Sequence, residues 1–278
     1  MTATPFGFRL AAAMAERGPL CVGIDPHPGL LQSWGLPVDA TGLERFALGT
    51  VAALGDRVAV FKPQSAFFEA FGSAGIAVLE KTLAAIADGG ALSLLDVKRG
   101  DIGSTMSAYA QAYLADGAPL AADAITVSPY LGFGSLQPAV DMAAKTGRGV
   151  FVLCLTSNPE GGAVQRAVGS DGALVAQHIA DRAADLNAGV DPLGSIGLVV
   201  GATVGAGGVD LTRVNGPLLA PGIGAQGATA DDLRAVFGTD LRAVLPSSSR
   251  EILSAGPSVA GLRTAAARTL DEVRTALG

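Results

Sequence analysis

The sequence has little charge, few aromatic residues and few lysines. Charged residues make up 16% of the 278 residues and aromatic residues 5%, and only four of the 19 basic residues are lysines. The net charge of −6 and the pI of about 4.9 argue against a nucleic-acid-binding protein, which would carry a basic patch or stripe. This acidic balance still allows a small anionic ligand, because arginine, lysine and backbone N–H groups can bind an anion locally.

Cysteine and long apolar runs are also scarce. The two cysteines, Cys21 and Cys154, lie far apart within separate apolar runs. This placement predicts reduced core residues of a cytoplasmic protein, with a disulfide or a metal pair as the alternative. Residues 1–18 have the pattern of a short amphipathic helix and not of a signal peptide. No uncharged apolar stretch is long enough to cross a membrane, so we predict no membrane segment.

Short apolar runs alternate with longer Ala/Leu-rich helical patterns along the whole chain. Continuous Val/Ile/Leu runs are typical of strands buried on both faces of a parallel sheet, and repeated βα units of this length favour a (β/α)₈ TIM barrel. We therefore predict an α/β fold with one domain over 1–278, with a doubly wound sheet as the alternative. A long polar insertion, 156–172, follows the fifth expected strand. The expected strands are 20–25, 58–62, 92–98, 124–130, 149–156, 196–203, 217–223 and 241–247.

Charged residues recur where these expected strands end. Asp25 ends the first strand, Lys62 the second, and Asp96 with Lys98 the third. Functional side chains of a barrel lie at the carboxyl ends of its strands. Residues two apart point to the same face, so Asp96 and Lys98 should lie together, about 7 Å apart along the strand. An ordinary ion pair at the top of the barrel is the alternative to a functional site.

The third strand carries the most specific motif. The D-x-K-x-x-D run from Asp96 to Asp101, followed by Ile102 and Thr105, resembles the signature of the orotidine 5′-monophosphate decarboxylase family. Five further segments appear in the order found in that family, and "FKPQ" is similar to its longer bacterial branch. These segments are "GIDP" (23–26), "FKPQSAFFE" (61–69), "TVSPYLG" (126–132), "APGIGAQG" (220–227) and "PSSSRE" (246–251).

This resemblance implies a homodimeric barrel that converts orotidine 5′-monophosphate to UMP and CO₂, the last step of UMP synthesis. It implies no cofactor and no metal. By motif position, Lys98 would protonate C6 of the pyrimidine, Asp96 would face the departing carboxylate, and Lys62 would complete the charge array. Asp101 would act in the partner's site, with Ile102 and Thr105 beside it.

The resemblance also implies the residues that bind the rest of the nucleotide. Asp25 would bind a ribose hydroxyl, and Ser128 would read the edge of the pyrimidine. The segment "GIGAQG" (222–227) fits a dinucleotide-binding pattern, but it follows the seventh expected strand, where barrels commonly bind phosphate. The expected phosphate-end residues are Pro221, Gln226, Ser249 and Arg250. Ser249 stands where the compact branch of the family has glycine.

Such a reaction demands preorganised charge. The electron pair left at C6 lies in the ring plane and cannot delocalise into the π system, so an ammonium group must stabilise it. The same ammonium group can then donate the proton. Two other readings stay open: a related phosphosugar lyase or synthase that uses a divalent metal, and a barrel that binds a phosphorylated metabolite without catalysis.

Overall fold

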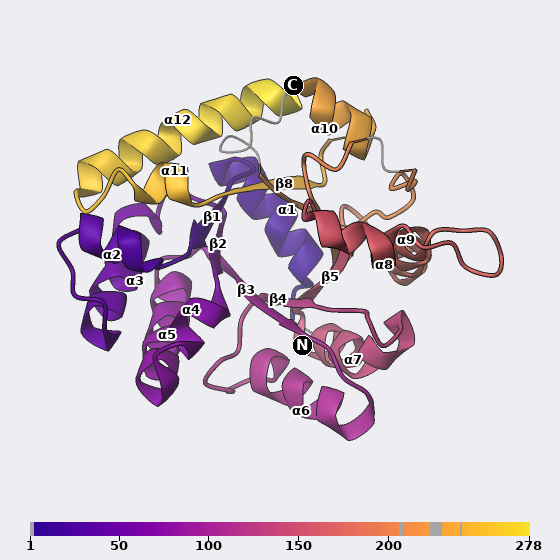
Figure 1. The fold of residues 1–278 in the computed structure, drawn as a ribbon, viewed down its shortest axis with the longest axis horizontal. Helices are drawn as coiled ribbons and strands as arrows, with labels where there is room; N and C mark the ends of the chain where they lie inside the picture. The colour runs from indigo at the N-terminus through magenta and orange to yellow at the C-terminus, as the bar shows by residue number, and fades with distance from the viewer. Residues whose placement is uncertain (1–2, 206–207, 223–229, 240) are drawn as a thin grey trace.

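Eight parallel strands close into a barrel in sequence order, with β8 beside β1, in the part of the chain that the structure describes (Figure 1). This computed structural model describes residues 3–205, 208–222, 230–239 and 241–278. The predicted (β/α)₈ TIM barrel is confirmed. The strands are β1 Cys21–Ile24, β2 Val60–Pro63, β3 Leu92–Arg99, β4 Ala124–Val127, β5 Gly149–Leu155, β6 Ile196–Val200, β7 Leu218–Pro221 and β8 Val244–Ser248.

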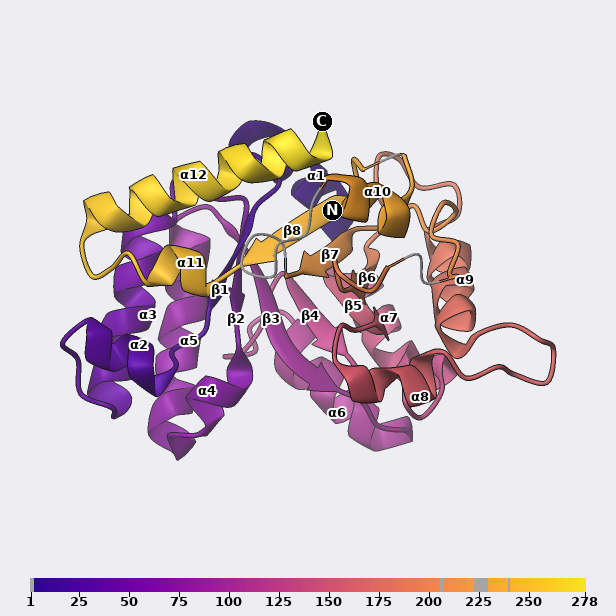
Figure 2. The ribbon, with the colours of Figure 1, turned by 45° about the horizontal axis from the view of Figure 1, so that its top comes forward.

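Helices surround the barrel because their apolar faces pack against the outer faces of the strands (Figure 2). Asp39 caps one of them, since its carboxylate accepts hydrogen bonds from the backbone N–H groups of Thr41 and Gly42. The helices are α1 Phe6–Arg17, α2 Pro28–Ser33, α3 Ala40–Leu54, α4 Ser65–Glu69, α5 Gly72–Asp88, α6 Gly103–Leu114, α7 Gln137–Thr146, α8 Gly162–Gln165, α9 Val175–Asn187, α10 Ala230–Phe237, α11 Arg250–Leu253 and α12 Val259–Leu277, with short 3₁₀ helices η1 Phe133–Leu136 and η2 Pro159–Gly161.

Alternate strand residues form two separate apolar cores. One core lies between the strands and the helices, and the other fills the inside of the barrel. The inner core explains why the strands are apolar on both faces and read as continuous hydrophobic runs. Its strand residues are Cys21, Val60, Leu94, Ala124, Phe151, Val199, Leu219 and Leu245, together with Ala59 just before β2.

Helix α1 closes the amino-terminal end of the barrel. Phe6 is fully buried and packs edge-on against Phe151, with ring centroids 5.9 Å apart. A Cβ atom on Gly149, at the start of β5, would collide with the Phe6 ring, which explains the glycine there. Arg9, on the same helix, forms an ion pair with Asp123 at the start of β4. With one end of the barrel closed, the functional residues lie at the opposite end.

The two cysteines are buried and form no disulfide, as the sequence predicts. Burial raises the pKa of both the Cys21 and the Cys154 thiol to about 12. They are therefore protonated core residues at neutral pH.

Among the described residues, no helix combines the length and the apolarity needed to cross a membrane.

Replacing Phe6 by alanine should lower the free energy of unfolding by about 3 kcal/mol, because it leaves a cavity between α1 and the barrel interior. Urea denaturation followed by circular dichroism measures this change. Phe8→Ala is the matched control on the same helix, since Phe8 is 51% exposed, and its effect should stay within about 0.5 kcal/mol. Equal changes in the free energy of unfolding for the two substitutions would contradict the packing of α1 against the end of the barrel.

Candidate active site

Four charged side chains meet at the carboxyl ends of the first three strands. Asp25 directly follows β1, Lys62 lies in β2, and Asp96 and Lys98 lie in β3. Lys62 Nζ lies 3.3 Å from Asp96 Oδ2 and 3.9 Å from Asp25 Oδ1. Lys98 Nζ lies 2.6 Å from Asp96 Oδ1. The predicted proximity of Asp96 and Lys98 is confirmed, and the cations and anions of the observed cluster alternate.

Asp96 is the centre of this cluster. Only 9% of its side chain is exposed, and its two oxygens face different lysines. Oδ1 also accepts a hydrogen bond of 2.7 Å from the hydroxyl of Thr126 in β4. Burial alone would raise the pKa of Asp96, but the ammonium groups of Lys62 and Lys98 outweigh burial and lower the pKa below its ordinary value. Asp96 is therefore a carboxylate at neutral pH.

Lys62 is the buried cation of the cluster, with 10% of its side chain exposed. Burial would lower its pKa, but the carboxylates of Asp25 and Asp96 raise the pKa above its ordinary value. Its ammonium group also donates a hydrogen bond of 3.3 Å to Gln64 Oε1, just beyond β2. Lys98 differs from Lys62 because 44% of its side chain is exposed. The Asp96 carboxylate is thus paired with a buried lysine, Lys62, and with a partly exposed one, Lys98.

Strand β3 is not regular where it carries these residues. Lys98 has a φ of +46°, in the left-handed region that residues with a Cβ atom rarely adopt. The pairing of β3 with β4 shifts between Leu95 and Arg99, so the ladder is interrupted at Lys98. Simple alternation of strand residues therefore predicted that Asp96 and Lys98 share a face, but not the irregular backbone at which Lys98 Nζ lies 2.6 Å from Asp96 Oδ1.

A cavity of about 310 Å³ opens beside the charge cluster. One wall is apolar and comes from the inside of the barrel. The opposite wall comes from the start of the 156–172 insertion, where Gln165 of α8 accepts a hydrogen bond from the Thr156 N–H and donates one to the Thr156 hydroxyl. The lining residues are Lys62, Asp96, Lys98, Thr126, Leu153, Thr156, Ser157, Asn158, Val199, Gly201, Leu219 and Pro221.

Four polar residues of this cavity were not predicted from the sequence: Thr126, Thr156, Ser157 and Asn158. Thr126 lies inside an apolar strand and looks like an ordinary β-branched strand residue. The other three belong to a polar insertion whose role could not be decided from composition. Their position directly after the fifth strand was the available signal, because loops at this end of a barrel line its active site.

The structure places the other residues of the third-strand motif away from this cavity. The Asp101 carboxylate accepts a hydrogen bond from the Ile102 N–H, and it forms no ion pair with any described residue of its own chain. Ile102 is 62% exposed, and Thr105 is exposed on the first turns of α6. Ser128 does not line the cavity; its N–H donates a hydrogen bond to the Arg99 carbonyl oxygen.

The expected phosphate end lies at β7, β8 and the start of α11. Pro221 lines the cavity at the end of β7, whereas Gln226 lies outside the described residues. Ser249 precedes α11, and its buried hydroxyl has no hydrogen-bond partner among the described residues. Arg250 is exposed and pairs with no carboxylate in the described part of the chain.

Asp25 and Ser249 lie on either side of Gly23. A Cβ atom at Gly23 would come within 3.2 Å of both Asp25 Oδ2 and Ser249 Oγ, so this glycine keeps the gap between them open. Asp25 Oδ1 is buried and accepts no hydrogen bond from the described residues. Two buried oxygens at the edge of the charge cluster therefore lack hydrogen-bond partners among the described residues, although Asp25 Oδ1 lies 3.9 Å from Lys62 Nζ, and a ligand hydroxyl group could satisfy them.

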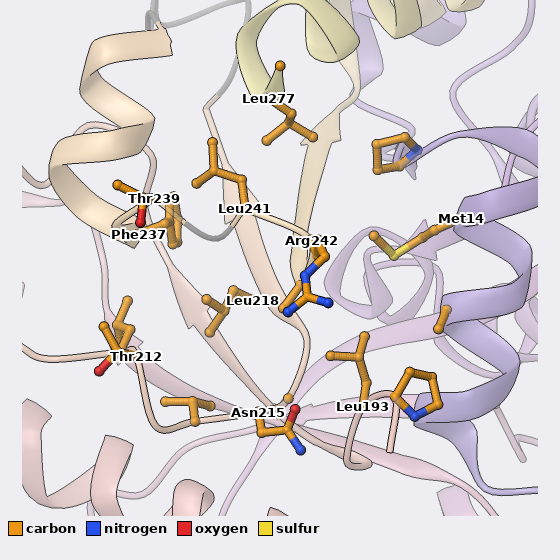
Figure 3. Close-up of a pocket in the computed structure, with 18 of the residues that line it drawn as sticks. Met14, Leu193, Thr212, Asn215, Leu218, Phe237, Thr239, Leu241, Arg242 and Leu277 are labelled. Atoms are coloured by element: carbon orange, nitrogen blue, oxygen red, sulfur yellow. The ribbon is translucent and has the colours of Figure 1, made fainter. Parts of the chain in front are cut away.

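A larger cavity, of about 840 Å³, lies near the amino-terminal end of the barrel, between α1, the segment before β8 and the carboxyl end of α12 (Figure 3). Figure 3 shows Met14, Leu218, Phe237 and Arg242 around it. None of the clustered lysines and aspartates lines this cavity. The smaller cavity is therefore the candidate active site.

The described residues contain no group of three or more histidine, cysteine, aspartate or glutamate side chains arranged to hold a metal ion.

Fold and site together define a (β/α)₈-barrel protein with alternating lysine and aspartate side chains at the carboxyl ends of its strands. The model of the orotidine 5′-phosphate decarboxylase / HUMPS family matches residues 18–265. The chain belongs to this family, as the sequence motifs predict.

Individual proteins give the same result. The chain is 67% identical to the orotidine 5′-phosphate decarboxylase of Salinispora arenicola and 65% identical to that of Salinispora tropica, each over 272 residues and 98% of both chains. Its structure is similar to that of a Streptomyces avermitilis protein provisionally assigned the same activity. That comparison has a TM-score of 0.96 and 60% identity, and it covers 100% of this chain and 97% of the other.

Replacing Lys62 by methionine should lower the free energy of unfolding by about 3 kcal/mol at pH 7, because Asp96 loses its buried partner. The folded-state pKa of Lys62 is raised, so its contribution is fully present below about pH 10 and is lost only as the pH rises through that higher pKa. The loss should therefore be constant between about pH 6 and pH 9. It should shrink below about pH 4 as Asp96 becomes protonated.

Urea denaturation across this pH range measures the difference. Lys81→Met is the control, because Lys81 pairs with Glu44 and is 56% exposed, and its loss should cost no more than about 0.5 kcal/mol. A Lys62→Met variant as stable as wild type would show that the buried ion pairs do not stabilise the fold.

Proposed function

We propose that the chain catalyses the decarboxylation of orotidine 5′-monophosphate to UMP and CO₂ in pyrimidine biosynthesis. The observation that carries the proposal is the Asp96 carboxylate held between two lysine ammonium groups at the edge of a cavity. Family membership and relatives of 65–67% identity support the substrate. The reaction proposed here uses only side chains of the protein, without a cofactor or a metal.

In the proposed mechanism the C6–carboxylate bond breaks, and its electron pair stays on C6 as CO₂ leaves. The Lys98 ammonium group stabilises this in-plane charge and then transfers its proton to C6. Solvent returns a proton to Lys98, whose side chain is the most exposed of the cluster. Lys62 is a poor proton donor by comparison, because its pKa is raised and its ammonium group is buried between Asp25 and Asp96.

Asp96 has two roles in this proposal. Its carboxylate faces the departing carboxylate of the substrate, and it fixes Lys98 Nζ at 2.6 Å. The lowered pKa of this carboxylate favours its charged form as a second anion approaches. The binding free energy of the non-reacting phosphate can offset that repulsion.

The remaining site residues are proposed to bind the nucleotide around this centre. Asp25 Oδ1, which accepts no hydrogen bond from the described residues, would accept one from a ribose hydroxyl. The guanidinium of Arg250, which pairs with no described carboxylate, would bind the phosphate beside the Ser249 N–H. Pro221 and Gln226 would complete the phosphate end, and Ser128 is the proposed contact to the pyrimidine edge.

We further propose a homodimer, placed in the cytoplasm, in which Asp101, Ile102 and Thr105 reach the partner's site. The exposure of Ile102 supports this arrangement, because an aliphatic side chain that is 62% exposed favours contact with another surface. Tyr130 and Leu131 are 78% and 52% exposed on the loop after β4. This loop adjoins the loop after β3, where Gly100 packs against Ser128.

Lys98→Ala should reduce turnover of orotidine 5′-monophosphate at least about 1,000-fold, because both charge stabilisation and the proton donor are lost. The assay follows nucleotide absorbance in buffer with excess EDTA, so that a metal-dependent lyase or synthase on the same barrel would be inactive. Lys145→Ala, on the exposed face of α7, is the control and should match wild type. The proposed reaction would be refuted if the wild-type protein bound the nucleotide without releasing CO₂.

Mixing inactive Lys98→Ala and inactive Asp101→Ala subunits should restore about one quarter of the wild-type activity. In a mixed dimer with shared sites, one of the two sites is intact, and random exchange makes half of the dimers mixed. Mixing Lys98→Ala with Lys62→Met is the control, because both lysines contact Asp96 of the same chain. No recovery despite proven subunit exchange would refute the shared site.

A further inference from the structure

The interruption of β3 lies directly opposite Thr126. Leu95 pairs with Ile125 and Arg99 pairs with Val127, so three residues of β3 face a single residue of β4. Those three residues are Asp96, Val97 and Lys98. A bulge of this kind leaves backbone groups without partners in the ladder and redirects the side chains next to it.

Lys98 carries the conformational cost of this bulge. Its φ of +46° lies in the left-handed region, which a residue with a Cβ atom adopts only when its surroundings hold it there. The regular ladder does not bond its N–H at this position. Instead, the Lys98 N–H donates a hydrogen bond of 3.0 Å to the hydroxyl oxygen of Thr126.

The same hydroxyl group also binds the carboxylate of the cluster. Thr126 Oγ1 donates a hydrogen bond of 2.7 Å to Asp96 Oδ1, the oxygen that Lys98 Nζ contacts at 2.6 Å. The direction of both bonds is fixed, because a backbone N–H can only donate and an ionised carboxylate can only accept. Thr126 is 1% exposed, so its hydroxyl is held inside the protein.

We propose that Thr126 is a positioning residue that sets the reactive geometry of Lys98 by bonding to its backbone N–H and to the Asp96 carboxylate. The inference rests on the proposed function, since it assigns the residue that orients the proton donor of that reaction. Thr126 joins the two parts of Lys98 that must be fixed together: the strained backbone, and the carboxylate to which its ammonium group is bonded.

Other buried threonines show that this arrangement is particular to Thr126. Thr50 in α3 and Thr82 in α5 are fully buried, and each donates its hydroxyl only to the carbonyl oxygen four residues earlier in its own helix. We expect the loss of either hydroxyl to affect its own helix and not the site. They therefore serve as matched controls for the loss of a buried threonine hydroxyl.

The test compares Thr126→Val, which keeps the shape without the hydroxyl, with Thr126→Ser, which keeps the hydroxyl. Thr50→Val is the control for stability. We expect Thr126→Val to reduce kcat roughly 10- to 100-fold, the range for losing a hydrogen bond to a charged group. KM and the Kd for UMP should stay within about threefold, and Thr126→Ser should retain kcat within about fivefold.

A merely structural threonine would give a different pattern. Thr126→Val with wild-type kcat would overturn the proposal, as would equal losses of kcat in Thr126→Val and Thr126→Ser. If Thr126→Val fails to fold, the comparison is made between Thr126→Ala and Thr126→Ser, which differ in the hydroxyl alone, and equal kcat values would again overturn it. Wild-type protein without turnover would refute the proposed reaction itself, so the two failures are distinguishable.

Discussion

The Asp96 carboxylate must keep its charge while only 9% of its side chain is exposed, and the arrangement of the site follows from that constraint. A buried charge is tolerated only when it is paired and hydrogen-bonded. Lys62 approaches one oxygen, and Lys98 and Thr126 approach the other. These partners come from β2, β3 and β4, so the closed barrel is what brings them together.

The cluster pairs its own charges, but two of the oxygens at its edge lack hydrogen-bond partners among the described residues. Asp25 Oδ1 and Ser249 Oγ are buried and unbonded among the described residues. A ligand that donated hydrogen bonds to these oxygens would satisfy both of them.

Much of this organisation could be predicted from the sequence, and the missing parts have physical causes. The continuous apolar runs predicted the eight strands within a few residues, and charges at strand ends predicted the meeting of Lys62, Asp96 and Lys98. The role of Thr126 could not be predicted, because a β-branched residue in "AITV" also fits an ordinary strand. The cavity wall formed by residues 156–158 could not be predicted, because its polar residues also suit a solvent-exposed loop.

The left-handed backbone at Lys98 was the least predictable feature and the most consequential for the site. A regular strand would place Asp96 and Lys98 about 7 Å apart along one face, with both side chains standing parallel. The bulge changes that direction and places Lys98 Nζ against Asp96 Oδ1. No glycine or proline marks the position; the residue there is Lys98, whose ammonium group contacts Asp96. The strain therefore coincides with the proposed proton donor, and the neighbouring strand supplies the hydrogen bond that maintains it.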